Sequence, residues 1–266
     1  MSEARASARP LALITGASVG LGRDFATIFA ANGYDLIVTA RNQQQLESVA
    51  TDLRAKYGVA VEVLPKDLSR PEATQEIFDH LQSSARLLDV LVNNAGFGTN
   101  GPFIDTDVVS QAAMLQVNVV ALTQLTRLFL PAMVKRHSGR VMNVASVAAF
   151  LPGPLMAVYY ASKAYVLSFS EAIASELAGT GVTVTAFCPG ATQTEFFTRA
   201  SMGASPLVRA NMMDSMTVAR IGYRAMQQGK RVAIAGFQNR LMAGAVHFTP
   251  RRLVTAISKK LNQSRQ

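Results

Sequence analysis

The sequence has little of several features, and each shortage removes a class of protein. It has a single cysteine, Cys188, so no disulfide can form within the chain, and this fits the reducing cytoplasm. Its three histidines, His80, His137 and His247, lack the spacing of metal ligands, so we expect no metal site. No run approaches eighteen uninterrupted apolar residues, so we expect no membrane-spanning helix. We therefore predict a cytoplasmic protein.

Acidic residues are missing from the last part of the chain. From Arg220 to Gln266 there are ten Lys or Arg and no Asp or Glu, so this tail accounts for the net charge of +9. One interpretation is a solvated basic face; the alternatives are contact with an anionic membrane surface or with an acidic partner. No recognised binding motif accompanies the charge, so we expect no nucleic-acid partner.

The chain does have a regular alternation of short apolar runs with longer amphipathic ones. The runs predicted as strands are 11–15, 35–40, 61–67, 88–96, 139–146, 181–190 and 231–235. The segments predicted as helices are 20–32, 43–57, a helix with Pro71 in its first turn, 107–136, 158–178 and 217–228. Apolar residues make up 49% of the chain and charged residues 16%, which is typical of a globular protein.

This alternation predicts an α/β fold: a single doubly wound Rossmann-type domain with a parallel, seven-stranded sheet covered on both faces. We place the domain at residues 10–236, because we find no linker or repeat within it. A flexible N-terminus at 1–9 precedes it. A basic amphipathic extension at 237–266 follows it, with an apolar helix face at Leu253, Val254, Ile257 and Leu261. That face could lie on a membrane, or cover the body or a neighbouring subunit, which we favour.

The first strand runs into the turn "TGASVGLG", which contains Gly16, Gly20 and Gly22 and opens a helix. Such a turn lets backbone N–H groups approach a pyrophosphate at the helix N-terminus. The second strand ends "VTARN", where Ala40 takes the place of the acidic residue that would bind a ribose 2′-hydroxyl, and Arg41 follows. An arginine here favours NADPH over NADH. The alternative is that Arg41 is an ordinary surface residue.

The stretch "AVYYASKAYV" sets two tyrosines close to a lysine. Tyr159 and Lys163 are i, i+4, and Tyr160 and Lys163 are i, i+3, so both pairs share a helix face. A phenol titrates near pH 10, about three units too high for a base at neutral pH. A nearby ammonium group favours the phenolate and lowers that pKa. The spacing alone leaves open which tyrosine acts, and whether either does.

Taken in order, the motifs resemble those of the short-chain dehydrogenase/reductase family over residues 10–235. The resemblance rests on "TGASVGLG", Asp67 in "KDLS", "NNAG" at 93–96, "YYASK" and "PGATQT" at 189–194. It implies a catalytic tetrad of Asn118, Ser146, Tyr159 and Lys163. It implies NADP(H) contacts at Gly16, Ser18, Gly20, Leu21, Gly22, Arg41, Asp67, Leu68, Asn94, Ala95, Gly96, Tyr159, Lys163, Pro189, Gly190, Thr192 and Thr194.

The resemblance implies hydride transfer between a nicotinamide and a carbonyl or alcohol carbon. Tyr159 would protonate the alkoxide, Lys163 would lower its pKa and hold the ribose, Ser146 would hold the carbonyl oxygen, and Asn118 would position a water. Tyr160 would be a packing or pocket residue. The predicted helices at 107–136 and 158–178 resemble those through which this family dimerises, so we expect a homodimer or homotetramer.

The substrate class is predicted from the segments around the site. The stretch 147–157 is uncharged, and the expected lid at 194–216 carries Phe196, Phe197, Met202, Met212, Met213 and Met216. We expect an apolar carbonyl or alcohol substrate, unless these side chains only pack the lid. One alternative is a 3-oxoacyl thioester reductase, with Arg199, Arg209 or the basic tail binding a carrier's phosphates. An alternative of another class is an NADPH-binding sensor or scaffold. Cys188 is interpreted as a buried strand thiol.

Overall fold

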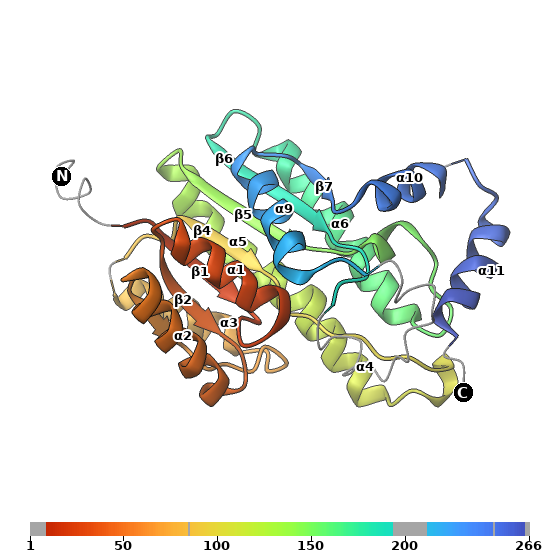
Figure 1. The fold of residues 1–266 in the computed structure, drawn as a ribbon, viewed down its shortest axis with the longest axis horizontal. Coiled ribbons are helices and arrows are strands. Elements are labelled where there is room, and N and C mark those ends of the chain that lie inside the picture. Colours follow the sequence, from red (N-terminus) through yellow and green to blue (C-terminus); the bar gives the residue numbers. More distant parts are fainter. Residues whose placement is uncertain (1–8, 85, 194–211, 247, 264–266) are drawn as a thin grey trace.

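The seven runs predicted as strands form one parallel sheet, in the order β3-β2-β1-β4-β5-β6-β7. The computed structural model describes residues 9–84, 86–193, 212–246 and 248–263. The expected N-terminal tail lies outside these residues except for Arg9, which donates to the carbonyl of Gly58. The predicted fold class is confirmed, and Figure 1 shows the sheet between two layers of helices.

The elements follow the predicted alternation closely. The strands are β1 Leu11–Thr15, β2 Asp35–Thr39, β3 Val61–Val63, β4 Val90–Asn93, β5 Gly139–Val144, β6 Val182–Cys188 and β7 Val232–Ile234. The α-helices are α1 Gly20–Ala31, α2 Gln43–Tyr57, α3 Ala73–Ser83, α4 Val108–Leu115, α5 Leu122–Lys135, α6 Ala157–Glu176, α9 Ser215–Gln227, α10 Phe237–Val246 and α11 Arg251–Asn262. Short 3₁₀ turns lie at Phe103–Asp105 and Val147–Phe150, and a π-helical turn at Gln116–Ala121.

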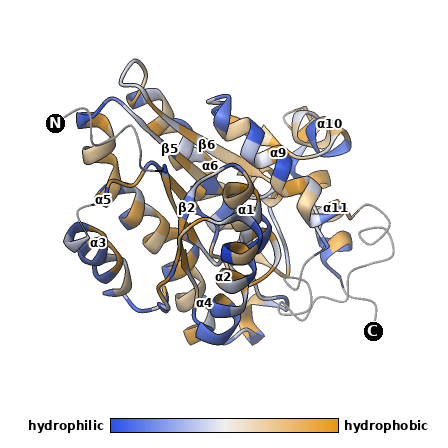
Figure 2. Ribbon diagram, turned by 60° about the vertical axis from the view of Figure 1, so that its left-hand side comes forward, coloured by the Kyte–Doolittle hydropathy of each residue, from blue (hydrophilic) through white to orange (hydrophobic). Residues whose placement is uncertain are grey.

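The two faces of the sheet are covered by different helices. On one face, α1, α2 and α9 contribute side chains such as Phe25, Leu46 and Val218 to a cluster with Ile14 and Phe187. On the other face the helices are α3, α5 and α6, and their members include Ile77, Phe129 and Ala174. Because both faces are buried, the strands are apolar along their whole length rather than alternating. Figure 2 shows hydrophobic strands at the centre and, around them, helices in which hydrophobic and hydrophilic residues alternate.

The strand order reverses beside β1, which determines where a ligand can bind. Leu13 in β1 is paired with Ile37 in β2 on one side and with Leu91 in β4 on the other. The chain therefore leaves β1 in one direction and β4 in the opposite one. A crevice opens at such a switch point, outside the carboxyl ends of the strands. The predicted glycine turn and the "NNAG" motif both follow these two ends.

Three local predictions differ from the structure. The strand predicted at 61–67 is ordered as a strand only over Val61–Val63, and it stops before Pro65, which lacks an N–H for the ladder. Pro71 is not in the first turn of α3 but lies before its N-cap residue, Glu72. The helix predicted at 107–136 is interrupted by the π turn at Gln116–Ala121, which brings Asn118 into the interior.

The run from Val108 to Lys135 is, among the described residues, the one helix long and apolar enough to cross a membrane by length and composition. Its inward residues pack on the body of the protein: Met114, Leu125 and Phe129 are all buried. Core helices of soluble proteins also pass a test of length and composition, so this finding is weak evidence for a membrane span.

The C-terminal extension forms α10 and α11, which lie together at one end of the molecule (Figure 1). The buried face of α11 consists of Val254, Ser258 and Asn262, which are spaced four residues apart. Two members of the predicted apolar face, Leu253 and Ile257, are about half exposed instead. The helix therefore covers the body with one face and presents a second, partly apolar face to solvent.

Candidate active site

The glycine-rich turn between β1 and α1 is too tightly folded to accept side chains at two of its glycines. Gly16 has φ +67°, and a Cβ there would lie 2.9 Å from the Cα of Ala95. A Cβ on Gly22 would lie 2.1 Å from the carbonyl oxygen of Gly16. Gly20, the first residue of α1, has φ +54°. The glycines allow the tight strand-to-helix turn that a Rossmann-type pyrophosphate site requires.

Among the described residues, none is found to cap the N-terminus of α1 with its side chain. Its N-cap residue, Val19, makes no side-chain hydrogen bond, and the first turn holds no acidic residue. Ser18 and Leu21 flank this end and are partly buried, with Leu21 packed on the core. The N–H groups and the positive end of the helix dipole are therefore available to an anionic group. The turn fits the dinucleotide that the sequence predicts.

The "NNAG" segment is fastened to the end of β1. The hydroxyl of Thr15 accepts hydrogen bonds from the backbone N–H of Asn94 at 3.0 Å and of Ala95 at 2.9 Å. In return, the side-chain amide of Asn94 donates to the carbonyl of Thr15 at 2.9 Å. These bonds hold the two strand ends together at the switch point. A Cβ on Gly96 would lie 3.3 Å from Nζ of Lys163, so this segment reaches the predicted catalytic residues.

The adenine-side candidates lie at the ends of the neighbouring strands. Arg41 is exposed just beyond β2, where a 2′-phosphate could reach it. Asp67 caps a turn, because its Oδ1 accepts hydrogen bonds from the backbone N–H and the hydroxyl of Ser69 at 3.0 and 2.8 Å. Leu68, the residue between Asp67 and Ser69, is buried in the core. The fold thus brings Arg41, Asp67 and Leu68 to the carboxyl edge of the sheet.

Tyr159 and Lys163 lie one turn apart on α6, and both are almost fully buried. The ammonium of Lys163 donates to the carbonyl of Val144, at the end of β5, at 2.8 Å. It also lies over the ring of Tyr159, 5.9 Å from the ring centroid. The lysine is therefore held between the strand end and the tyrosine ring.

Ser146 follows β5 and begins the short turn Val147–Phe150, where its hydroxyl accepts a hydrogen bond from the N–H of Ala148 at 3.1 Å. The side chain of Ser146 also forms a hydrogen bond with Tyr159. This hydrogen bond favours the phenolate and so lowers the pKa of the tyrosine. The serine is thus fixed by its own backbone turn and shared with the tyrosine. Ser146, Tyr159 and Lys163 converge although they are separated along the chain.

Burial decides the pKa values of the tyrosine and the lysine. Desolvation raises the pKa of Tyr159 to about 12, and the hydrogen bond to Ser146 opposes this increase. Desolvation lowers the pKa of Lys163 to about 8. The net shift of the Tyr159 pKa is upward, and Lys163 is not among its causes, so the lowering of this pKa by the ammonium stays a prediction. At neutral pH the phenol is protonated, which is the form that can give up a proton.

Asn118 is buried on the π turn and uses its side chain to hold a loop. Its Nδ2 donates to the carbonyl of Phe97 at 2.9 Å and to the hydroxyl of Ser162 at 3.1 Å, while its Oδ1 accepts from the N–H of Phe97 at 3.1 Å. A Cβ on Gly96 would lie 3.0 Å from this Oδ1, on the side where Lys163 lies. Asn118 therefore joins the loop after β4 to α6 beside the lysine.

The "PG" segment after β6 lies next to the turn that begins at Ser146. The carbonyl of Pro189 accepts a hydrogen bond from the N–H of Val147 at 3.0 Å, next to Ser146. Thr192 is buried and donates to the carbonyl of Gly190 at 2.9 Å. A Cβ on Gly190 would lie 2.2 Å from the side-chain nitrogen of Asn239 in α10. Thr194, also predicted to bind the cofactor, lies outside the described residues.

Cys188 is fully buried at the end of β6, as predicted for a strand thiol, and burial raises its pKa to about 12. Most of the predicted lid, including Phe196, Phe197, Met202 and the two arginines at 199 and 209, lies outside the described residues. Of the methionines, Met213 and Met216 pack against the core. For these two side chains, packing is the interpretation that the structure supports.

Sequence reasoning missed a row of buried polar side chains beneath the site. Asn93 donates to the hydroxyl of Thr126 at 3.0 Å and to Oδ1 of Asn143 at 2.9 Å. Asn143 in turn donates to the hydroxyl of Ser170 at 3.0 Å. The row connects β4 and β5 to α5 and α6. Of these two helices, α6 carries Tyr159 and Lys163. A polar asparagine inside each of two apolar strands was the signal that could have found it.

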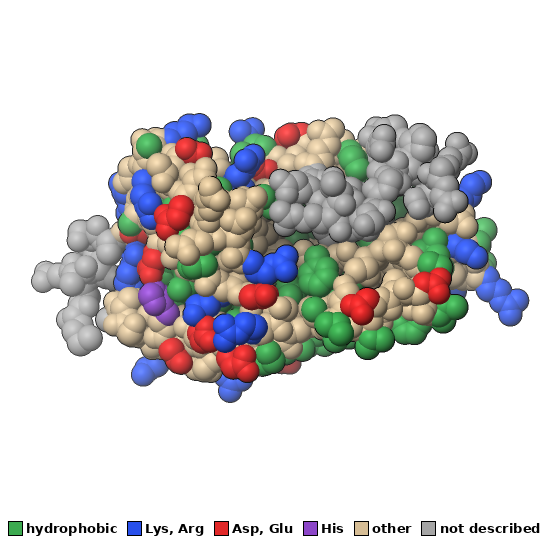
Figure 3. Space-filling view, turned by 90° about the horizontal axis from the view of Figure 1, so that it is seen from below, with side chains coloured by type: hydrophobic (Ala, Val, Ile, Leu, Met, Phe, Trp, Pro, Cys, Tyr) green, Lys and Arg blue, Asp and Glu red, His purple; other side chains and the backbone are tan. Residues whose placement is uncertain are grey.

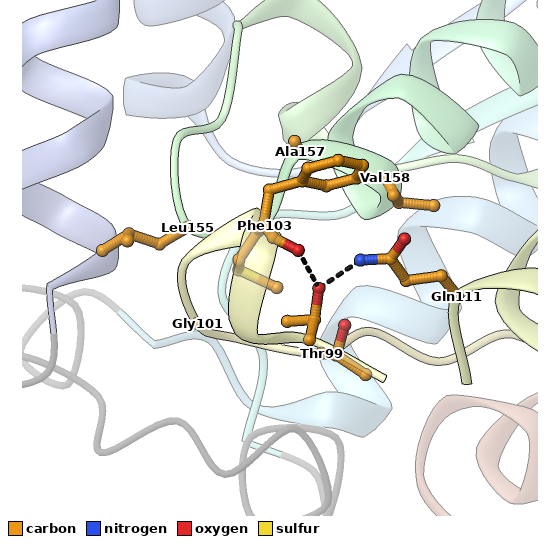
Figure 4. A pocket seen from close by; sticks show the side chains of 9 residues that line it. Thr99, Gly101, Phe103, Gln111, Leu155, Ala157 and Val158 are labelled. Atoms are coloured by element: carbon orange, nitrogen blue, oxygen red, sulfur yellow. Dashed lines mark hydrogen bonds between the residues drawn. The ribbon is translucent and has the colours of Figure 1, made fainter. Parts of the chain in front are cut away.

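A shallow pocket lies beside the site, between the loop after β4 and the start of α6 (Figure 4). It is lined by Thr99, Gly101, Phe103, Thr106, Gln111, Leu155, Met156, Ala157 and Val158. The hydroxyl of Thr106 donates to the carbonyl of Phe103 at 2.9 Å and accepts from Gln111. Neither Ser146 nor Tyr159 lines it, so it is a separate hollow next to the start of α6.

Comparison with known proteins agrees with this geometry. A family model described as short chain dehydrogenase matches residues 10–204. The chain belongs to the short-chain dehydrogenase family. A solved short-chain dehydrogenase from Sphingobium yanoikuyae in complex with NADPH is 33% identical, with a TM-score of 0.81 over 90% of this chain and 94% of that one. A bulky-bulky ketone specific alcohol dehydrogenase from Comamonas testosteroni is 28% identical, with a TM-score of 0.77 over 90% and 93%.

Among curated proteins, a very-long-chain 3-oxoacyl-CoA reductase from Pyrenophora tritici-repentis is 38% identical over 65% of this short-chain dehydrogenase. The match covers only 52% of the fungal reductase. The chain thus spans about half the length of this curated relative.

Proposed function

We propose that this short-chain dehydrogenase is an NADPH-dependent reductase of apolar ketones or aldehydes, with alcohol oxidation as the reverse reaction. The observation that carries the proposal is the convergence of Ser146, Tyr159 and Lys163 beside a glycine turn that fits a pyrophosphate. A serine and a protonated phenol next to an ammonium group form a proton-donating site for a developing alkoxide.

The roles follow from the chemistry of each side chain. Bound NADPH would supply the hydride. Tyr159, whose pKa of about 12 keeps it protonated at neutral pH, would donate its proton to the substrate oxygen. Ser146 would donate a hydrogen bond to the same oxygen and so hold it at the phenol. Lys163, charged below its pKa of about 8, would stabilise the phenolate left behind and bind the nicotinamide ribose. Asn118 would position the loop and a water beside Lys163.

The preference for NADPH is proposed from Arg41, which is exposed at the end of β2 where an NADH-binding protein would carry an acid. The related Sphingobium yanoikuyae enzyme, described in complex with NADPH, adds support. Replacing Arg41→Ala should raise the KM for NADPH by about tenfold or more, because a charge-assisted hydrogen bond to the phosphate is lost. The KM for NADH should change little.

The measurement is steady-state kinetics with each nucleotide at a fixed carbonyl substrate. Arg224→Ala is the matched control, since Arg224 is also an exposed arginine but lies on α9. Equal losses for NADPH and NADH in the Arg41 variant would show that this arginine does not select the 2′-phosphate.

The substrate class is proposed from the uncharged segment 147–157 and from the relatives. The alcohol dehydrogenase of Comamonas testosteroni is named for bulky ketones, and this favours a bulky apolar ketone. The fungal relative named as a 3-oxoacyl-CoA reductase favours the alternative, a 3-oxoacyl thioester. Purified protein with NADPH should consume a bulky ketone with the higher kcat/KM, followed as loss of NADPH absorbance. A higher value for the thioester would select the alternative, and no turnover of either would contradict the proposed function.

A homo-oligomer is proposed from apolar side chains left on the surface of the long helices. Leu115, Val120 and Tyr165 are exposed, and Tyr165 shares a hydrogen bond with Thr123 at 3.0 Å across α5 and α6. Further exposed side chains at Ile104, Val108 and Val109 extend the apolar surface along α4. Figure 3, seen from below, shows hydrophobic side chains gathered along one edge of the molecule. A second copy of the chain would cover such a surface.

Contact with an anionic membrane stays a prediction and is assigned to the exposed face of α11. On this face Leu253 and Ile257 are exposed near Lys259 and Lys260. Exposed apolar and basic side chains together suit a membrane with anionic lipid headgroups. A cytoplasmic location is proposed from Cys188, which is buried as a free thiol.

A further inference from the structure

The last residue of α11 lies against the two segments that border the substrate side of the site. Asn262 is buried, with 6% of its surface exposed. Its Oδ1 accepts a hydrogen bond from the hydroxyl of Tyr160 at 3.0 Å, and its Nδ2 donates to the carbonyl of Pro154 at 3.0 Å. Its backbone carbonyl accepts from the side chain of Asn100 at 3.0 Å. Asn262 thus joins three residues of these two segments, all of them more than 100 positions away along the chain.

The partners of Asn262 belong to parts of the chain that the active site depends on. Asn100 lies in the loop after "NNAG", and Pro154 lies in the loop after Ser146. These two loops are also joined directly, because the N–H of Gly101 donates to the carbonyl of Leu155 at 2.8 Å. Gly101 and Leu155 both line the pocket of Figure 4. The spacing of the loops is therefore set by one direct hydrogen bond and by the bridge through Asn262.

Tyr160 connects Asn262 to Tyr159, because it contacts both residues. Its ring packs against Gly153 so closely that a Cβ on Gly153 would lie 2.1 Å from a ring carbon. The rings of Tyr159 and Tyr160 meet edge to face, with centroids 6.0 Å apart. The end of α11, the loop at 153–154 and the two tyrosines therefore form one packed unit.

The rest of α11 packs on the body of the protein and so keeps Asn262 beside the two loops. Val254 and Ser258 lie on the same face as Asn262 and are also buried. Further along the chain, α10 contacts the other side of the site, because Asn239 packs on Gly190 of the "PG" segment. The C-terminal extension is thus in contact with both the cofactor side and the substrate side.

We infer that Asn262 is a positioning residue that holds the segments 97–105 and 153–160 at a fixed separation and so determines which carbonyl substrates fit beside Tyr159. This rests on the proposed function. Because Asn262 acts through Tyr160 and the loops, its loss affects substrate binding more than proton transfer. Bulky ketones, which fill more of the space between the two loops, depend on Asn262 more than small ones.

The test compares Asn262→Ala with the wild-type protein, using one bulky and one small carbonyl substrate. The KM for the bulky substrate rises by about five- to tenfold, a loss in the range expected for one or two hydrogen bonds. The kcat for the small substrate stays within about twofold, since the proton donor is unchanged. Tyr160→Phe, which removes a single hydroxyl and leaves α11 intact, shows a smaller shift in the same direction. Gln263→Ala, at the exposed next residue, is the control and changes neither constant.

A second measurement separates this inference from the proposed function. Amide hydrogen exchange at Gly101 and through 97–105 becomes faster in Asn262→Ala than in the Gln263→Ala control, and this requires no turnover. Unchanged exchange together with unchanged KM overturns the inference. Equal loss of kcat on both substrates also overturns it, because that result indicates a general structural role. If the wild-type protein reduces no carbonyl compound, the proposed function fails, while exchange still decides whether Asn262 holds the loops.

Discussion

Replacing Tyr159→Phe should lower kcat for carbonyl reduction by about 10²- to 10⁴-fold, the usual contribution of a positioned general acid. The substitution removes only the hydroxyl that would protonate the substrate oxygen. The ring remains, so its packing with Tyr160 and its place beneath the ammonium of Lys163 are kept. The affinity for NADPH should therefore change little. The measurement is single-turnover consumption of bound NADPH, with nucleotide affinity determined separately by titration.

Tyr165→Phe is the matched control for this experiment. Tyr165 lies on the same helix but is exposed, and its hydroxyl meets Thr123 rather than Ser146. We expect the control to reduce substrate at the wild-type rate. A Tyr159→Phe variant that retained most of its activity would contradict the assigned proton donor. If turnover were lost while a cellular effect of the protein persisted, the sensor or scaffold alternative would be favoured instead.

Replacing Gly22→Ala should reduce the free energy of unfolding by about 2–3 kcal/mol, because overpacking of a closely packed site has a cost of this order. The new Cβ would lie 2.1 Å from the backbone oxygen of Gly16 and 2.6 Å from the side-chain nitrogen of Asn94. Neither neighbour can move away easily, because one is a backbone oxygen and the side chain of Asn94 is hydrogen-bonded to the carbonyl of Thr15. The turn must shift, so NADPH binding should weaken as well. Denaturant unfolding and nucleotide titration measure the two effects.

The control for this prediction is Gly244→Ala in α10. A Cβ there would meet no atom within 4 Å, and the residue lies in a helix, where alanine is preferred to glycine. We expect this variant to be as stable as the wild-type protein or slightly more stable. If both variants unfolded at the same denaturant concentration, the steric account of the glycine turn would be wrong.

Much of the fold could be predicted because its signals are local. The apolar runs of β1, β4 and β6 are buried on both faces, so they stand out from the amphipathic helices between them. The π turn could not be predicted in this way. It adds no change of composition to the run from Val108 to Lys135, and its effect, the burial of Asn118, appears only when the helix is packed on α6.

The candidate site could be predicted in part. The order of short motifs located Ser146, Tyr159 and Lys163, which the fold then brings together. The pKa of Tyr159 could not be predicted from its i, i+4 spacing to Lys163, because the spacing gives proximity but not the depth of burial. Asn262 was missed for another reason. Its partners are 102, 108 and 162 residues away, and no periodicity within one helix reports contacts at such separations.

The two ends of the described chain lie on opposite sides of the molecule (Figure 1). Arg9 donates to the carbonyl of Gly58, which caps the end of α2, whereas Gln263 directly follows Asn262, which contacts the loops at 97–105 and 153–160. A label attached at Gln263 would therefore stand next to the loops that Asn262 contacts, and one attached at Arg9 would not. Kinetic constants measured on a preparation labelled at Gln263 would report on the label as well as on the enzyme.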